Sequence, residues 1–195
     1  TGYDDQNFTS HLSSLYLMDA NGGQKRLWAG GLPSSPSNIA WAADGSGVYY
    51  RMEESGEANL YSVALAGTPR RITKGGQVLN GFSVSRTGQV AATVVTPYRP
   101  AVLVTFNLQK PDAAKELVDV NADVLADIKL GEQEELRFKS PDGLDLQGWL
   151  IKPADFEPGK TYPMVLWIHG GPWSMYSLAF NWGWQNFAAS GYAVL

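Results

Sequence analysis

The chain has 195 residues, of which 44% are hydrophobic and 17% are charged, a composition typical of a folded globular protein and not of a disordered one. Its formal net charge of -4 comes without a basic cluster or a charged tail, which argues against a nucleic-acid partner. It has no cysteine, which excludes disulfides, thiolate metal sites and a cysteine nucleophile and fits cytoplasm and periplasm equally. No signal peptide and no apolar run of about 18 residues occurs, so we expect no membrane partner.

The first two thirds of the chain carry an internal repeat of short strand-like runs bounded by turn residues. The first complete copy has runs at 39–41, 48–50, 59–63 and 70–73, and the second has runs at 82–84, 90–95, 102–106 and 116–118. A partial copy precedes them, with runs at 15–19 and 25–28. The order recurs at a period of about 43 residues, and four strands per period are typical of a β-propeller blade.

The turns recur together with the strands. Asp44-Gly45 and Thr87-Gly88 join the first and second runs of the two complete copies, and the third and fourth runs are joined by Asn21-Gly22-Gly23 and Ala66-Gly67. A β-sandwich is the alternative for evenly spaced strands. Because order, spacing and turns recur together, we predict that residues 1–122 are the C-terminal blades of an incomplete β-propeller, with further blades upstream.

The repeat lapses into a polar stretch around residues 121–130, and we place an inter-domain crossing at 123–133. A second domain is predicted over 134–195. It begins with a hairpin in which 135–140 alternates polar and apolar residues, Pro141-Asp142-Gly143 turns, and 144–151 returns as the partner strand.

Residues 162–168 form a continuous apolar run, which predicts a strand covered on both faces. The segment His169-Gly170-Gly171-Pro172 follows, and a helix is expected over 177–190, ended by Gly191 before a buried strand that starts at Tyr192. Strand, glycine-rich turn, helix and strand begin a doubly wound α/β sheet, where ligand chemistry gathers at the carboxyl ends of strands. This helix would carry Leu178, Trp182, Gln185 and Ala189 on one face.

The glycines of this turn have a chemical use. A backbone N–H that stabilises a tetrahedral oxyanion must face an open cavity, and a side chain beside it would block the approach. In α/β-hydrolases one such N–H comes from this loop and the other comes from the residue after the nucleophile. An ordinary strand-to-helix turn is the alternative for Gly170-Gly171-Pro172.

Four segments of the second domain resemble the prolyl oligopeptidase family, in particular its acylaminoacyl peptidase and dipeptidyl aminopeptidase-like branch. They are residues 138–143, 148–153, 162–172 and 187–194, in the order that the family has, and the repeat lies where the family has its propeller. The resemblance implies a serine peptidase that hydrolyses short peptides through an acyl-enzyme. It also implies a Ser-Asp-His triad and a propeller that restricts access to the site. We expect no cofactor and no metal.

By the same resemblance Gly171 lends an N–H to the oxyanion hole and Gly170 allows the turn. His169 stands where other branches of the family have a Tyr that helps the oxyanion. We expect His169 to shape the loop, because the triad His comes last in chain order in α/β-hydrolases. No G-x-S-x-G occurs, so we expect the nucleophile, acid and base outside these residues and no activity from this chain alone. Trp173 is a candidate for a substrate pocket.

Two other functions stay open, an esterase of the same fold and a propeller binding module with a non-catalytic hydrolase domain. Glu53-Glu54 resembles the paired acids with which dipeptidyl peptidases hold a substrate's amino terminus, but we expect a solvated turn there. The sequon at 7–9 is expected by chance. The chain closes on the apolar run 191–195, so we interpret it as an internal fragment of a longer protein, of open oligomeric state.

Overall fold

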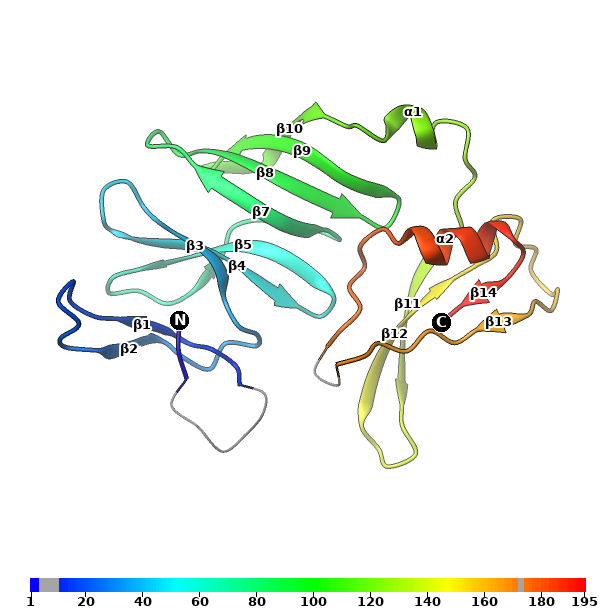
Figure 1. Cartoon of the computed structure of the whole chain (residues 1–195), viewed down its shortest axis with the longest axis horizontal. Helices are drawn as coiled ribbons and strands as arrows, with labels where there is room; N and C mark the ends of the chain where they lie inside the picture. Colours follow the sequence, from blue (N-terminus) through cyan, green and yellow to red (C-terminus); the bar gives the residue numbers. More distant parts are fainter. Residues whose placement is uncertain (4–10, 172–173) are drawn as a thin grey trace. The chain divides into compact units, whose positions relative to one another are not determined.

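The computed structural model describes residues 1–3, 11–171 and 174–195 (Figure 1). They divide into two compact units, the first made of residues 1–95 and 101–119 and the second of residues 96–100 and 120–195. Strands dominate both units, so the fold is mostly β. Among the described residues, neither helix has the length and apolarity needed to cross a membrane.

Ten strands lie between residues 15 and 118, and each run of the predicted repeat overlaps one of them. The strands are β1 (Leu15–Leu17), β2 (Arg26–Ala29), β3 (Ser37–Trp41), β4 (Gly47–Glu54), β5 (Glu57–Ala64), β6 (Arg70–Arg71), β7 (Val78–Val84), β8 (Gln89–Thr96), β9 (Arg99–Asn107) and β10 (Lys110–Val118). The predicted positions of the strands in the repeat are therefore confirmed.

The strands pair mostly with their neighbours in the chain. β1 and β2 form an antiparallel hairpin, β3 to β6 form one antiparallel series, and β7 to β10 form a second. The two series meet through one parallel pair, Ala58 with Val78. Sequential antiparallel pairing is what short turn-linked strands with alternating burial favour.

The turn between β4 and β5 corrects the expectation for Glu53 and Glu54. Ser55 and Gly56 both have positive φ, 51° and 82°, as a two-residue primed hairpin turn requires. The two glutamates therefore lie on β4 and not in the turn. The carboxylate of Glu53 lies 2.6 Å from the Arg51 guanidinium, and that of Glu54 accepts from the Tyr61 hydroxyl at 3.1 Å.

Within the described part of the first unit, two apolar cores form. One gathers residues of β1, β2, β4 and β5 around Tyr50, and the other gathers residues of β5, β7, β8 and β9 around Leu60 and Leu79. Beside the second core, the buried amide of Asn59 accepts from the Thr73 hydroxyl at 2.8 Å. A buried polar group with a partner is stable there, so this contact joins β5 to the segment after β6.

The second unit has a four-stranded sheet in the order β11-β12-β14-β13. Its elements are α1 (Ala122–Leu125), β11 (Gln133–Lys139), β12 (Asp145–Ile151), β13 (Met164–Val165), α2 (Trp182–Ala189) and β14 (Ala193–Val194). The predicted hairpin is confirmed as β11 and β12, which pair in register from Gln133 with Ile151 to Lys139 with Asp145. The short helix α1 lies at the start of the polar stretch in which the repeat lapses.

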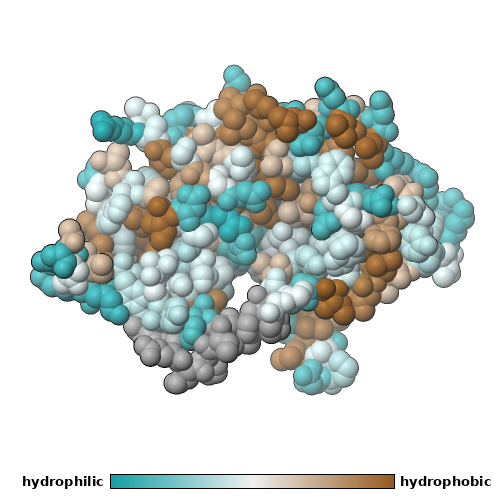
Figure 2. Space-filling model, in the orientation of Figure 1, coloured by the Kyte–Doolittle hydropathy of each residue, from teal (hydrophilic) through white to brown (hydrophobic). Residues whose placement is uncertain are grey.

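Of the apolar run at 162–168, predicted as one strand, only Met164–Val165 forms a strand, β13, which pairs in parallel with β14. Backbone hydrogen bonds continue this pairing on both sides of β13. Backbone hydrogen bonds run from Ala193 to Pro163, from Leu195 to Val165, and from Trp167 to Leu195, at 2.9, 2.9 and 2.7 Å. The prediction that both faces are covered is wrong for the described residues. Met164, Leu166 and Ile168 are 56%, 60% and 74% exposed, because α2 covers only the opposite face of the strand. Hydrophobic residues accordingly reach the surface of this unit in the space-filling view (Figure 2).

Helix α2 starts five residues later than predicted. Of the four residues predicted to share one face, Leu178 and Gln185 are buried, whereas Trp182 and Ala189 are exposed. The Asn181 side chain accepts from the Trp184 amide at 3.1 Å and caps the helix, so residues 177–180 stay outside it. Trp184, Gln185 and Ala188 are buried, whereas Trp182 is 50% exposed. The predicted end at Gly191 is confirmed: its φ is 85°, and its amide donates to Ala188 at 3.1 Å.

Candidate functional site

The glycine loop, His169 to Gly171, follows the paired apolar run at the carboxyl end of a parallel strand. All three residues are exposed. Gly171 has a φ of 138°, a conformation that residues with a Cβ rarely adopt. A Cβ at Gly170 would meet no heavy atom within 4 Å, so the backbone requires glycine at position 171 and not at 170.

The imidazole of His169 is engaged by its own loop. Its Nδ1 lies 3.1 Å from the carbonyl oxygen of Gly170. Since a carbonyl oxygen only accepts, Nδ1 carries the proton of this hydrogen bond. The ring also lies edge-on to the ring of Tyr176, with 6.1 Å between the ring centroids. The other predicted site residue, Trp173, lies outside the described residues, as does Pro172.

Two tryptophans bind Tyr176 on the far side of the loop. The indole N–H of Trp167 donates to the Tyr176 hydroxyl at 2.7 Å, and the indole N–H of Trp149 donates to the Tyr176 carbonyl oxygen at 2.9 Å. The Tyr176 ring also meets the buried ring of Trp184 at 5.2 Å. Sequence reasoning gave no role to Tyr176 or Trp149, although Trp149 lies in one of the four segments that resemble the family.

A cavity of about 440 Å³ opens beside these aromatic residues. Its walls are residues 146–149 of β12, residues 166–169, residues 174–176, Phe138, Trp184, Val194 and Leu195. Strands β12 and β14 diverge here, because they pair with each other only at Ile151 and Val194. The lining is mostly apolar, with His169 at one side, and apolar walls with few polar groups are typical of small-molecule sites.

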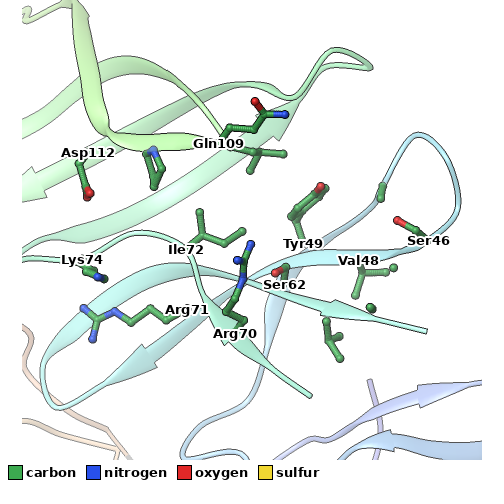
Figure 3. Close-up of a pocket in the computed structure, with 16 residues that line it drawn as sticks. Ser46, Val48, Tyr49, Ser62, Arg70, Arg71, Ile72, Lys74, Gln109 and Asp112 are labelled. Atoms are coloured by element: carbon green, nitrogen blue, oxygen red, sulfur yellow. The ribbon is translucent and has the colours of Figure 1, made fainter. Parts of the chain in front are cut away.

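A second cavity, of about 590 Å³, lies in the first unit (Figure 3). Its lining combines cations, Arg70 and Lys74, with the carboxylate of Asp112 and the amide of Gln109. The Arg71 guanidinium is already held by the Glu57 carboxylate and by the Thr73 carbonyl oxygen. The lining has no nucleophile paired with a base, so the glycine loop is the better candidate for chemistry.

The described residues also contain no group of three or more His, Asp or Glu that could hold a metal ion. What the loop offers is backbone N–H groups, in a conformation that glycine makes accessible at Gly171. Such groups stabilise a developing negative charge.

No family model matches the chain. It is 32% identical over 189 residues to the uncharacterized peptidase YuxL of Bacillus subtilis, covering 95% of this chain and 27% of that protein. It is 29% identical to dipeptidyl-peptidase 5 of Porphyromonas gingivalis, covering 96% and 28%. The acylaminoacyl peptidase of Pyrococcus horikoshii has a similar structure, with a TM-score of 0.80 and 28% identity over 97% of this chain and 29% of that one. The chain thus spans little more than a quarter of the length of these relatives.

Proposed function

We propose that this chain carries the oxyanion-hole loop of a serine peptidase, because its homologues are acylaminoacyl peptidases and dipeptidyl-peptidase 5 enzymes of the prolyl oligopeptidase family. The whole protein hydrolyses peptide bonds of short peptides through an acyl-enzyme. Residues 1–122 are the last blades of its β-propeller, 123–133 are the crossing, and 134–195 begin its α/β-hydrolase domain. The nucleophile, acid and base belong to other parts of the protein.

The observation that carries the proposal is the backbone of Gly171. It stands exposed after a strand of a parallel pair, with a φ of 138°. An amide donor at this place meets the negative oxygen of a tetrahedral intermediate and costs no reorganisation when the charge develops. Gly170 precedes it in the turn, and His169 shapes the loop by donating from Nδ1 to the Gly170 carbonyl oxygen.

The strand order of the first unit supports the propeller. Each of the two antiparallel series, β3 to β6 and β7 to β10, has four strands in chain order, as one blade has. In the proposed enzyme the blades restrict entry, so that only short peptides reach the active site. The proposed role of Trp173 is to line the substrate pocket.

Gly171→Ala in the whole protein tests the loop. A Cβ at a φ of 138° strains the turn and displaces the amide, so we expect kcat for a short peptidyl amide to fall by about 100-fold with KM little changed. Gly143→Ala is the matched control, since Gly143 has a φ of 90° in the β11–β12 turn and a Cβ there meets nothing within 4 Å. An equal loss of kcat in the two variants would refute the oxyanion role of Gly171.

Assays of the whole wild-type protein distinguish the proposed peptidase from the two alternatives, the esterase and the binding module. Cleavage of acyl esters with no cleavage of peptidyl amides would favour the esterase. A protein that cleaves neither, and that no fluorophosphonate probe labels, would favour the binding module.

A further inference from the structure

We propose that Tyr176 is a positioning residue, which closes the base of the glycine loop and fixes where Gly170 and Gly171 stand. The inference rests on the proposed function, since the loop matters because of its amides. Tyr176 touches no reacting group and acts through the loop.

The hydrogen bond between Trp167 and Tyr176 joins two residues nine positions apart, one on each side of the glycine loop. Trp167 follows β13 and continues its pairing, because its amide donates to the carbonyl oxygen of Leu195 at 2.7 Å. An indole has one N–H donor, and that of Trp167 donates to the Tyr176 hydroxyl. The chain leaving the strand is thus tied to the chain returning from the loop.

Both partners are held by rigid elements. The Trp167 ring lies against α2, where a Cβ on Gly183 would come within 3.2 Å of it and where the Phe187 ring meets it edge-on at 6.0 Å. Tyr176 is held by Trp149 of β12 through its carbonyl oxygen and by the buried Trp184 through its ring. The loop is therefore anchored to β12, to the segment between β13 and the loop, and to α2.

This anchoring bears on catalysis because oxyanion donors act only when they are preorganised. A displacement of about 1 Å can cost about 100-fold in rate. The edge-on contact of His169 with Tyr176 transmits the position of the tyrosine to the first residue of the loop. Losing one neutral hydrogen bond at the base should loosen the loop without removing its donors.

The first test is kinetic and uses the whole protein. Tyr176→Phe keeps the ring on Trp184 and the carbonyl oxygen for Trp149 but removes the acceptor, and Trp167→Phe removes the donor. We expect each variant to lower kcat for a short peptidyl amide about tenfold at unchanged KM, and the double variant to lower it no further than either single one. Additive losses, or a change in KM alone, would overturn the inference.

Tyr162→Phe is the matched control. The Tyr162 hydroxyl accepts from the Glu157 amide at 2.8 Å and so holds another loop of the same unit. We expect its kcat to equal that of the wild type. A tenfold loss in this control as well would mean that any tyrosine hydroxyl of the unit serves stability, and the inference would fall.

The second test does not depend on activity. In protein labelled with ¹⁵N at glycine and tryptophan, we expect Tyr176→Phe to shift the indole N–H resonance of Trp167 and to lower the order parameters of the Gly170 and Gly171 amides. Unchanged loop amides would overturn the inference whatever the kinetics. A wild type that cleaves neither amides nor esters would instead refute the proposed function, and the loop amides would still decide the role of Tyr176.

Discussion

Tyr50 and Tyr61 face each other across the β4–β5 pair, with their ring centroids 5.7 Å apart. Tyr50 is fully buried, and its hydroxyl has no hydrogen-bond partner among the described residues. The Tyr61 hydroxyl donates to the Glu54 carboxylate. Burial raises the pKa of Tyr50 to about 12, with a smaller contribution from Tyr61. Burial, and then the hydrogen bond to Glu54, also raise the pKa of Tyr61 to about 12.

These pKa values predict a loss of stability in alkali. The unfolded chain releases the two phenolic protons near pH 10, before the folded chain does. The contribution of these two tyrosines to the free energy of unfolding should therefore be level below about pH 10 and fall as the pH rises toward 12. Urea unfolding at several pH values measures it, and Tyr50→Phe should flatten the fall. A curve of the same slope in the wild type and in Tyr50→Phe would contradict the assignment.

Within the second unit, Gln185 of α2 joins the helix to the segment before β11. Its Oε1 accepts from the Gly131 amide at 2.7 Å, and its Nε2 donates to the Gly131 carbonyl oxygen at 3.1 Å. Both residues are buried, and a Cβ on Gly131 would collide with the Lys152 carbonyl oxygen. One side-chain amide thus satisfies a backbone donor and a backbone acceptor that water does not reach.

Gln185→Leu should lower the free energy of unfolding of this unit by about 3 kcal/mol, because it leaves the buried N–H and C=O of Gly131 unpaired. Asn186→Ala is the control, since Asn186 is exposed on the same helix. Denaturant titrations, followed by tryptophan fluorescence, compare the two variants. Similar midpoints for both would show that the amide of Gln185 contributes little.

Over the whole molecule, both units expose large apolar side chains. Trp41 of the first unit is 57% exposed, and Leu166 of the second is 60% exposed. Single exposed apolar residues are common, but several in one short segment, as at 164–168, are typical of a surface that another element covers. The chain by itself therefore presents surfaces that favour association.

We predict that the 195-residue chain, produced alone, binds a hydrophobic dye, melts over a broad range and hydrolyses no short peptide. The expected inactivity follows from the lack of a G-x-S-x-G motif in the sequence. Dye fluorescence, thermal melts and a fluorophosphonate probe check the three parts. A sharp two-state melt without dye binding, or labelling of a serine in this chain, would contradict the prediction.

Local patterns in the sequence were sufficient for the strands, the hairpin turns and the Gly191 helix end, because alternating burial and positive-φ glycines act over a few residues. The glycine loop was also recognisable from its residues. The sequence did not reveal the late start of α2, where the Asn181 cap outweighed the apolar pattern of 177–181.

Other features depended on the tertiary structure. The exposure of Leu166 and Ile168 depends on which face of the segment α2 covers. The sequence of an apolar run does not show which of its faces another element will cover. The hydrogen bonds of Trp149 and Trp167 to Tyr176 form only once β12, the neighbouring strand and α2 have packed together. The sequence by itself therefore determined the segments and the loop, and the folded chain decided the anchors that hold the loop, because such contacts join residues far apart in sequence.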